Sequence, residues 1–91
     1  MSQIVEKEVL IRNKYGIHAR PAAMLVQLAN KYKSEIFVIK DTMEVNGKSI
    51  IGVMTLAANC GSKLKIRASG DDAQEAVDTI TKLFDEKFGE Q

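Results

Sequence analysis

The sequence is poor in several residue types that often reveal a protein's chemistry. Its 91 residues include no tryptophan, one cysteine (Cys60), one proline (Pro21) and one histidine (His18). A single cysteine excludes an internal disulfide. Because Cys60 has no second Cys or His at ligand spacing, we expect no metal site. No apolar run approaches 18 residues, and the first residues lack the order of a signal peptide, so we expect a cytoplasmic protein with no stable membrane insertion.

Neither sign of charge dominates the chain. Thirteen Lys and Arg residues stand against twelve Asp and Glu residues, which leaves a formal net charge of +1. This balance gives no bulk electrostatic case for binding nucleic acid or anionic lipid, so partner choice must depend on local patches. The length and an apolar content of 45% are those of one globular domain, spanning residues 1–91.

Alternating apolar residues and β-branched content predict four strands, at residues 8–13, 34–40, 43–45 and 64–68. Asp41 and Thr42 form the turn between the second and third strands. In the last strand Leu64, Ile66 and Ala68 share one face. In the second, Phe37 and Ile39 would lie on the open face if Ile36 and Val38 point inward, and the sequence offers no account of that placement beyond partner contact or simple strand propensity.

Apolar residues at three- and four-residue spacing predict one helix from Ala19 to about Lys31 and another that starts after Gly70 and runs to the chain end, with Phe88 on its apolar stripe. Asp72 and Glu75 have capping-box spacing before that last helix. A short helix from Ser49 to about Leu56 completes the order βαββαβα. We therefore expect an α+β open-faced sandwich, with two long helices on one face of a four-stranded antiparallel sheet.

His18 stands at the start of the first predicted helix, after a glycine turn at Gly16 and two positions before Arg20. A helix start exposes unpaired backbone N–H groups and the positive end of the helix dipole, which favour an anion such as phosphate. Imidazole is a nucleophile that can carry a phosphoryl group near neutral pH. These residues predict reversible phosphorylation of His18, with Arg20 and the N–H groups near Ala19 stabilising the phosphate oxygens.

Residues 16–23, GIHARPAA, resemble the active-site signature of the HPr family, the phosphocarriers of the bacterial phosphoenolpyruvate-dependent sugar phosphotransferase system. Residues 47–54, GKSIIGVM, are similar to the segment that in many family members carries a regulatory serine, here Ser49. The likeness extends from about Val9 to Phe84.

The resemblance implies a phosphocarrier and not an enzyme. Its phosphate would sit on Nδ1 of His18, its donor would be a phosphorylated histidine on enzyme I, and its acceptors would be IIA domains of sugar permeases. Phosphoenolpyruvate would be the ultimate phosphoryl source, with no bound cofactor. A monomer is expected.

Ser49 precedes a short apolar helix, where serine is a favoured N-cap. The family resemblance adds an HPr kinase/phosphorylase as a partner that phosphorylates this serine. Phosphoserine at a helix start is compatible with the helix dipole but places negative charge beside a docking surface, so we expect the fold to survive and partner affinity to fall.

A docking surface is expected beside His18, because Ile50, Ile51 and Met54 cannot all face inward on so short a helix. A surface with Ile51 as its one exposed apolar residue would need no such explanation. The family resemblance favours docking. The predicted docking residues are Gly16, Ala19, Met24, Gln27, Ile50, Ile51, Gly52 and Met54.

Three other functions can be compared with the sequence: nucleotide binding, nucleic-acid binding and a regulatory role in a nitrogen branch. Gly47, Lys48 and Ser49 resemble the end of a Walker A motif, but Thr42 stands where its first glycine is required, so nucleotide binding is not expected. A small nucleic-acid-binding module would use Lys63, Lys65 and Arg67, which project from one strand, but five aromatics and balanced charge argue against it. A nitrogen-branch regulatory relative of the carrier remains open, because the sequence does not assign the branch.

Overall fold

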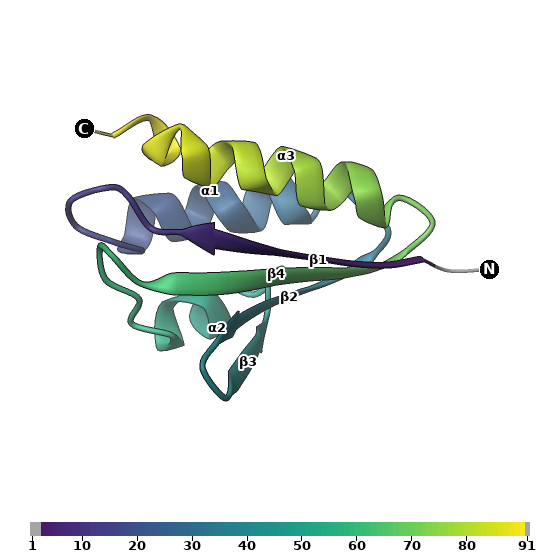
Figure 1. Ribbon diagram of the computed structural model, residues 1–91, viewed down its shortest axis with the longest axis horizontal. Coiled ribbons are helices and arrows are strands. Elements are labelled where there is room, and N and C mark those ends of the chain that lie inside the picture. Colours follow the sequence, from purple (N-terminus) through teal and green to yellow (C-terminus); the bar gives the residue numbers. More distant parts are fainter. Residues whose placement is uncertain (1–2, 91) are drawn as a thin grey trace.

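A computed structural model of the chain describes residues 3–90 (Figure 1). The strands are β1 (Gln3–Leu10), β2 (Glu35–Lys40), β3 (Met43–Asn46) and β4 (Lys63–Gly70). The helices are α1 (Ala19–Ala29), α2 (Ile50–Thr55) and α3 (Ala73–Asp85), followed by a 3₁₀ turn, η1 (Lys87–Gly89). The order βαββαβα and the antiparallel sheet confirm the predicted fold class.

The four strands form one sheet in the order β1-β4-β2-β3, and every neighbouring pair is antiparallel. Strand β4 is central, and its alternation is as predicted: Leu64, Ile66 and Ala68 are buried. Leu64 lies opposite Val9 of β1, and Ile66 lies opposite Val38 of β2, so the inward residues of three strands meet across the ladder. The side chains of these pairs form the part of the hydrophobic core that lies on the inner face of the sheet.

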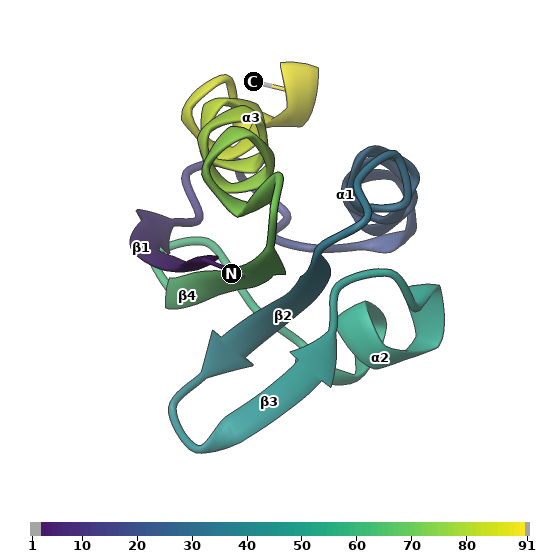
Figure 2. The same cartoon turned by 90° about the vertical axis from the view of Figure 1, so that its right-hand side faces the viewer.

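All three helices lie on one side of the twisted sheet (Figure 2). Helix α3 packs against β1 and β4, while α1 packs against both other helices. The two long helices, α1 and α3, each bury an apolar stripe, as their residue spacing predicts, while α2 buries a single residue. The buried helical residues include Ala22, Leu25 and Ala29 of α1, Val53 of α2, and Ala76, Val77, Ile80 and Phe84 of α3.

The first strand differs from its predicted range of 8–13, since β1 begins by Gln3 and ends at Leu10. Burial does alternate through Val9, Ile11 and Asn13, which explains the sequence pattern. After Leu10, however, the backbone leaves the ladder. Ile11 instead exchanges hydrogen bonds with Gly61 and Ser62 of the loop before β4, at 2.8 and 2.9 Å. This segment therefore begins the loop that leads to His18.

The last helix also differs from its prediction, because it ends at Asp85 and not near the end of the chain. Lys87 and Phe88 have φ values of 56° and 54°, a left-handed conformation that stops the α-helix. Phe88 is still fully buried, and its ring packs edge-on against Phe84 with centroids 4.8 Å apart. The apolar spacing predicts a continuing helical stripe, but the backbone turns at Lys87 and Phe88 and brings the Phe88 ring back to the core.

The predicted capping box at Asp72 and Glu75 is wrong. Asp72 occupies the N-cap position of α3 but makes no side-chain capping bond. Its carboxylate instead accepts hydrogen bonds from the residues that precede β2. Within residues 3–90, none of the helices is long and apolar enough to cross a membrane.

Candidate functional site

His18 lies at the junction between the loop after β1 and helix α1. It is the N-cap residue, with extended backbone angles (φ −85°, ψ −172°), and its carbonyl accepts the N–H of Ala22 at 3.0 Å. The imidazole makes no side-chain cap, so it is free for other contacts. Its side chain is 40% exposed, which leaves it accessible to another macromolecule.

The loop before His18 is held by backbone contacts. Gly16 has a φ of 67°, and a Cβ atom there would lie 2.4 Å from the carbonyl oxygen of Ala58, so the position requires glycine. The next residue, Ile17, is buried and donates its N–H to the same carbonyl at 2.9 Å. These contacts fix the backbone on the N-terminal side of His18.

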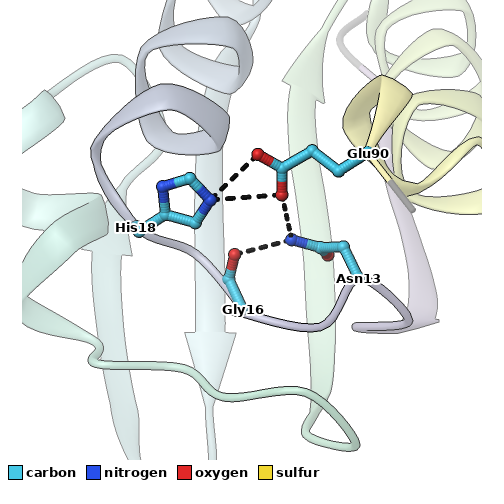
Figure 3. Close-up of polar contacts among 4 residues, drawn as sticks. All are labelled: Asn13, Gly16, His18 and Glu90. Atoms are coloured by element: carbon cyan, nitrogen blue, oxygen red, sulfur yellow. Dashed lines mark hydrogen bonds and ion pairs between the residues drawn. The ribbon is translucent and has the colours of Figure 1, made fainter.

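The carboxylate of Glu90 reaches the imidazole from the other end of the chain (Figure 3). Nε2 of His18 lies 2.9 Å from Oε2 and 3.1 Å from Oε1 of Glu90. The amide of Asn13 donates to Oε1 of Glu90 at 3.1 Å and to the carbonyl of Gly16 at 2.7 Å. Asn13 is fully buried, so it ties the carboxylate to the same loop that presents His18.

The electrostatics of Glu90 follow from these contacts. Burial raises the pKa of Glu90, but hydrogen bonds with His18 and Asn13, together with favourable electrostatic interactions with His18 and Arg20, outweigh that effect and hold the pKa below its ordinary value. Glu90 is therefore ionised at neutral pH. An ionised carboxylate only accepts hydrogen bonds, so Nε2 of His18 carries the hydrogen in this contact.

The other ring nitrogen, Nδ1, points away from Glu90 in Figure 3. Nδ1 belongs to the N-cap residue of α1, and by helix geometry the N–H groups of Ala19 and Arg20 that follow it have no acceptor inside the helix. Ala19 and Arg20 are exposed, so an anion beside the ring could reach these donors and the guanidinium. The arrangement combines a nucleophilic nitrogen with donors for phosphate oxygens.

Three residues at this site were not singled out from the sequence. Asn13 and Glu90 carry no local signal, because their contact depends on the turn at Phe88 that redirects the chain end. Tyr15 is exposed, and its ring lies edge-on to the His18 ring with centroids 6.3 Å apart. Among residues 3–90, no three His, Cys, Asp or Glu side chains are grouped as metal ligands would be.

Ser49 is the N-cap of α2, as predicted. Its hydroxyl oxygen accepts the N–H of Gly52 at 3.2 Å. The preceding loop is tied to α1, because Nζ of Lys48 donates to the carbonyl of Tyr32 at 2.6 Å and the amide of Asn30 donates to the carbonyl of Lys48 at 3.2 Å. Ser49 thus lies on a loop fixed to the C-terminal end of α1.

Apart from Gly16, which lies in the loop before α1, the predicted docking residues lie on two helices that pack together, α1 and α2 (Figure 2). Ile50, Ile51 and Met54 are all exposed, while Val53 is buried, so more than one apolar side chain faces outward. Gly52 is half-buried. Met24 and Gln27 line a groove that α1 shares with Leu83 of α3. Gly16 is buried and presents its backbone only.

Comparisons with known proteins agree with this geometry. A family model described as PTS HPr component phosphorylation site matches residues 5–86. Phosphocarrier protein HPr of Treponema pallidum is 47% identical over 97% of this chain and 100% of its own length.

Two solved structures are also similar. The crystal structure of HPr-C-His from Thermoanaerobacter tengcongensis superposes with a TM-score of 0.92 at 47% identity, covering 96% of this chain and 98% of that chain. The structure of Crh from Bacillus subtilis, which reveals a swapped domain in an intertwined dimer, has a TM-score of 0.74 at 42% identity, covering 91% and 95% of the two chains. A dimer therefore occurs among similar proteins, and the expectation of a monomer is not confirmed.

Proposed function

The chain belongs to the HPr family of phosphotransferase-system phosphocarriers, and we propose that His18 is the residue that carries its phosphoryl group. One observation supports this proposal most strongly. The imidazole is 40% exposed at the start of α1, with Nε2 held by Glu90 and Nδ1 directed away from that carboxylate. Nδ1 is therefore the ring nitrogen available for attack on phosphorus.

The donor in this proposal is the phosphohistidine of enzyme I, which is itself charged from phosphoenolpyruvate. The acceptors are IIA domains of sugar permeases. Arg20 and the N–H groups at the start of α1 stabilise the phosphate oxygens, because a mobile guanidinium and a helix N-terminus both favour an anion. No resident cofactor takes part, since the phosphoryl group passes directly between protein side chains.

Ser49 is the proposed regulatory site, phosphorylated by an HPr kinase/phosphorylase in hosts that have one. Its hydroxyl is half-buried and accepts one N–H bond, and the exposed residues Ile50 and Ile51 follow it directly. A phosphate here would place almost two negative charges beside an apolar surface. Docking of partners would weaken while α2 remained capped.

Partners dock on the surface formed by Gly16, Ala19, Met24, Gln27, Ile50, Ile51, Gly52 and Met54. Support comes from the three exposed apolar side chains of α2 and from the packing of α2 against α1, the helix that His18 begins. We propose that the carrier works as a monomer, which light scattering at assay concentrations tests. A nitrogen-branch role is separated from the sugar branch by comparing transfer rates to the two kinds of IIA domain.

The testing experiment mixes the purified chain with phosphoenolpyruvate, Mg²⁺ and enzyme I, then adds a IIA domain. We expect one acid-labile, base-stable phosphate per chain, and its transfer to the IIA domain. The control is His18→Ala, which should incorporate none while its circular dichroism spectrum is unchanged. A fully active His18→Ala variant would overturn the assignment.

A further inference from the structure

The contact between His18 and Glu90 is a built arrangement of three side chains. The Glu90 side chain is 17% exposed, and both carboxylate oxygens lie within 3.1 Å of Nε2 of His18. The buried amide of Asn13 fixes Oε1, and its second hydrogen bond ends on Gly16, two residues before the histidine. The carboxylate is therefore held in a fixed position relative to the imidazole ring.

The chain turn before Glu90 is also specific. Lys87 and Phe88 have left-handed backbone angles, and the Phe88 ring is buried against Phe84. Left-handed angles on two successive non-glycine residues are unfavourable, and burial of the aromatic ring offsets that cost. This turn anchors the segment that carries Glu90 at the end of the molecule where α1 begins, as Figure 1 shows.

We infer that Glu90 is a positioning residue for phosphoryl transfer: by accepting the Nε2 hydrogen of His18, it holds the ring in the tautomer whose unprotonated Nδ1 attacks phosphorus. This inference rests on the proposed function of His18. It follows the general rule that the partner of one imidazole nitrogen decides the state of the other. Nothing else among the polar contacts of residues 3–90 engages the ring.

The same contact balances charge during transfer. The lone pair of Nδ1 forms a bond to phosphorus while the P–N bond of the donor phosphohistidine breaks, and the electron pair of that bond returns to the donor ring. His18 keeps its Nε2 hydrogen, so its ring becomes cationic as the new P–N bond forms. The ionised carboxylate of Glu90, whose Oε2 lies 2.9 Å from Nε2 in the unmodified chain, then stabilises that positive charge, as carboxylates do beside an imidazolium.

The first test needs no partner protein. Because the chain has one histidine, ¹⁵N labelling gives a single pair of imidazole signals. In the unmodified protein we expect a protonated Nε2, an unprotonated Nδ1, and slow exchange of the Nε2 hydrogen with water. In Glu90→Ala we expect the two nitrogen signals to move toward each other and the Nε2 hydrogen to exchange faster. Glu90→Gln retains an acceptor oxygen, so its signals should stay closer to those of the unmodified chain.

The second test measures transfer from enzyme I. Loss of a charge-assisted hydrogen bond predicts that Glu90→Ala lowers the transfer rate about tenfold, with Glu90→Gln in between. Asp85→Asn is the matched control, because it removes an exposed carboxylate from the same end of the chain and should change neither readout.

If the imidazole ¹⁵N signals of Glu90→Ala are the same as those of Asp85→Asn, the positioning role is overturned and the proposed function is left intact. A transfer rate that is unchanged or faster in Glu90→Ala would do the same, since the carboxylate would then be idle or repel the incoming phosphate. Failure of the unmodified chain to accept phosphate would instead overturn the proposed function.

Discussion

Asp72 accepts hydrogen bonds from both the backbone N–H and the hydroxyl of Ser34, which lies 38 positions earlier in the chain. The second carboxylate oxygen accepts the N–H of Lys33 at 2.9 Å. The start of α3 is thereby tied to the residues that lead into β2. An aspartate at an N-cap position here joins two segments of the fold in place of capping its own helix.

This contact predicts a pH dependence of stability. The Ser34 hydroxyl, then the Lys33 N–H, lower the pKa of Asp72 despite partial burial of the carboxyl. A carboxyl whose pKa is lower in the folded state stabilises the fold above its unfolded pKa, about 3.9, and loses that contribution as the pH falls through the folded value. Urea unfolding of Asp72→Asn should therefore show lower stability at pH 7, with a difference from the unmodified chain that shrinks below about pH 4. Parallel stability curves across this range would contradict the prediction.

Ala57, just after α2, has a φ of 48° and is exposed. A left-handed alanine is unfavourable by about 1–2 kcal/mol, and the greater unfolded-state entropy of glycine offsets part of the gain on substitution. Ala57→Gly should therefore stabilise the protein by about 0.5 kcal/mol, measured by urea unfolding. If Ala57→Gly instead lowers the stability, as the same substitution does in the interior of a helix, then the backbone at Ala57 is not strained.

Ser49 allows its structural and regulatory roles to be separated. Ser49→Ala removes the hydroxyl that accepts the Gly52 N–H and should lower stability by about 1 kcal/mol. Ser49→Asp keeps a capping oxygen, so its stability should stay near that of the unmodified chain while transfer from enzyme I slows. The regulatory proposal fails if Ser49→Asp transfers at the normal rate, or if the kinase places no phosphate on this serine.

Ile51 is 77% exposed, so Ile51→Gln should leave stability within about 0.5 kcal/mol of the unmodified chain. If Ile51 contacts partners, loss of about 1 kcal/mol of binding would raise the KM for enzyme I roughly fivefold. Ile4→Gln is a matched control, since Ile4 is 71% exposed on β1, at the sheet edge opposite β3. Equal KM values for the two variants would remove Ile51 from the docking surface.

Local patterns were enough to predict most of the fold. The inward face of β4 and the cap at Ser49 depend on neighbours within a few residues, and both were predicted. The strand order was not, since pairing β4 between β1 and β2 is decided by long-range packing that periodicity does not encode.

The site was predicted in part for the same reason. The loop from Gly16 to Arg20 carries His18 and the start of α1 together, so its motif is continuous in sequence. Glu90 lies 72 positions away and reaches the ring only because the backbone turns at Phe88. Apolar spacing alone extends α3 through Phe88 and gives no sign of that turn.

The most direct test is to identify the atom that carries the phosphate. The ¹⁵N-labelled chain, phosphorylated by enzyme I and phosphoenolpyruvate, is observed by ³¹P and ¹⁵N NMR at alkaline pH. We predict one ³¹P signal coupled to Nδ1 of His18, with the hydrogen retained on Nε2. A phosphate coupled to Nε2, or one carried by a residue other than His18, would contradict the central claim.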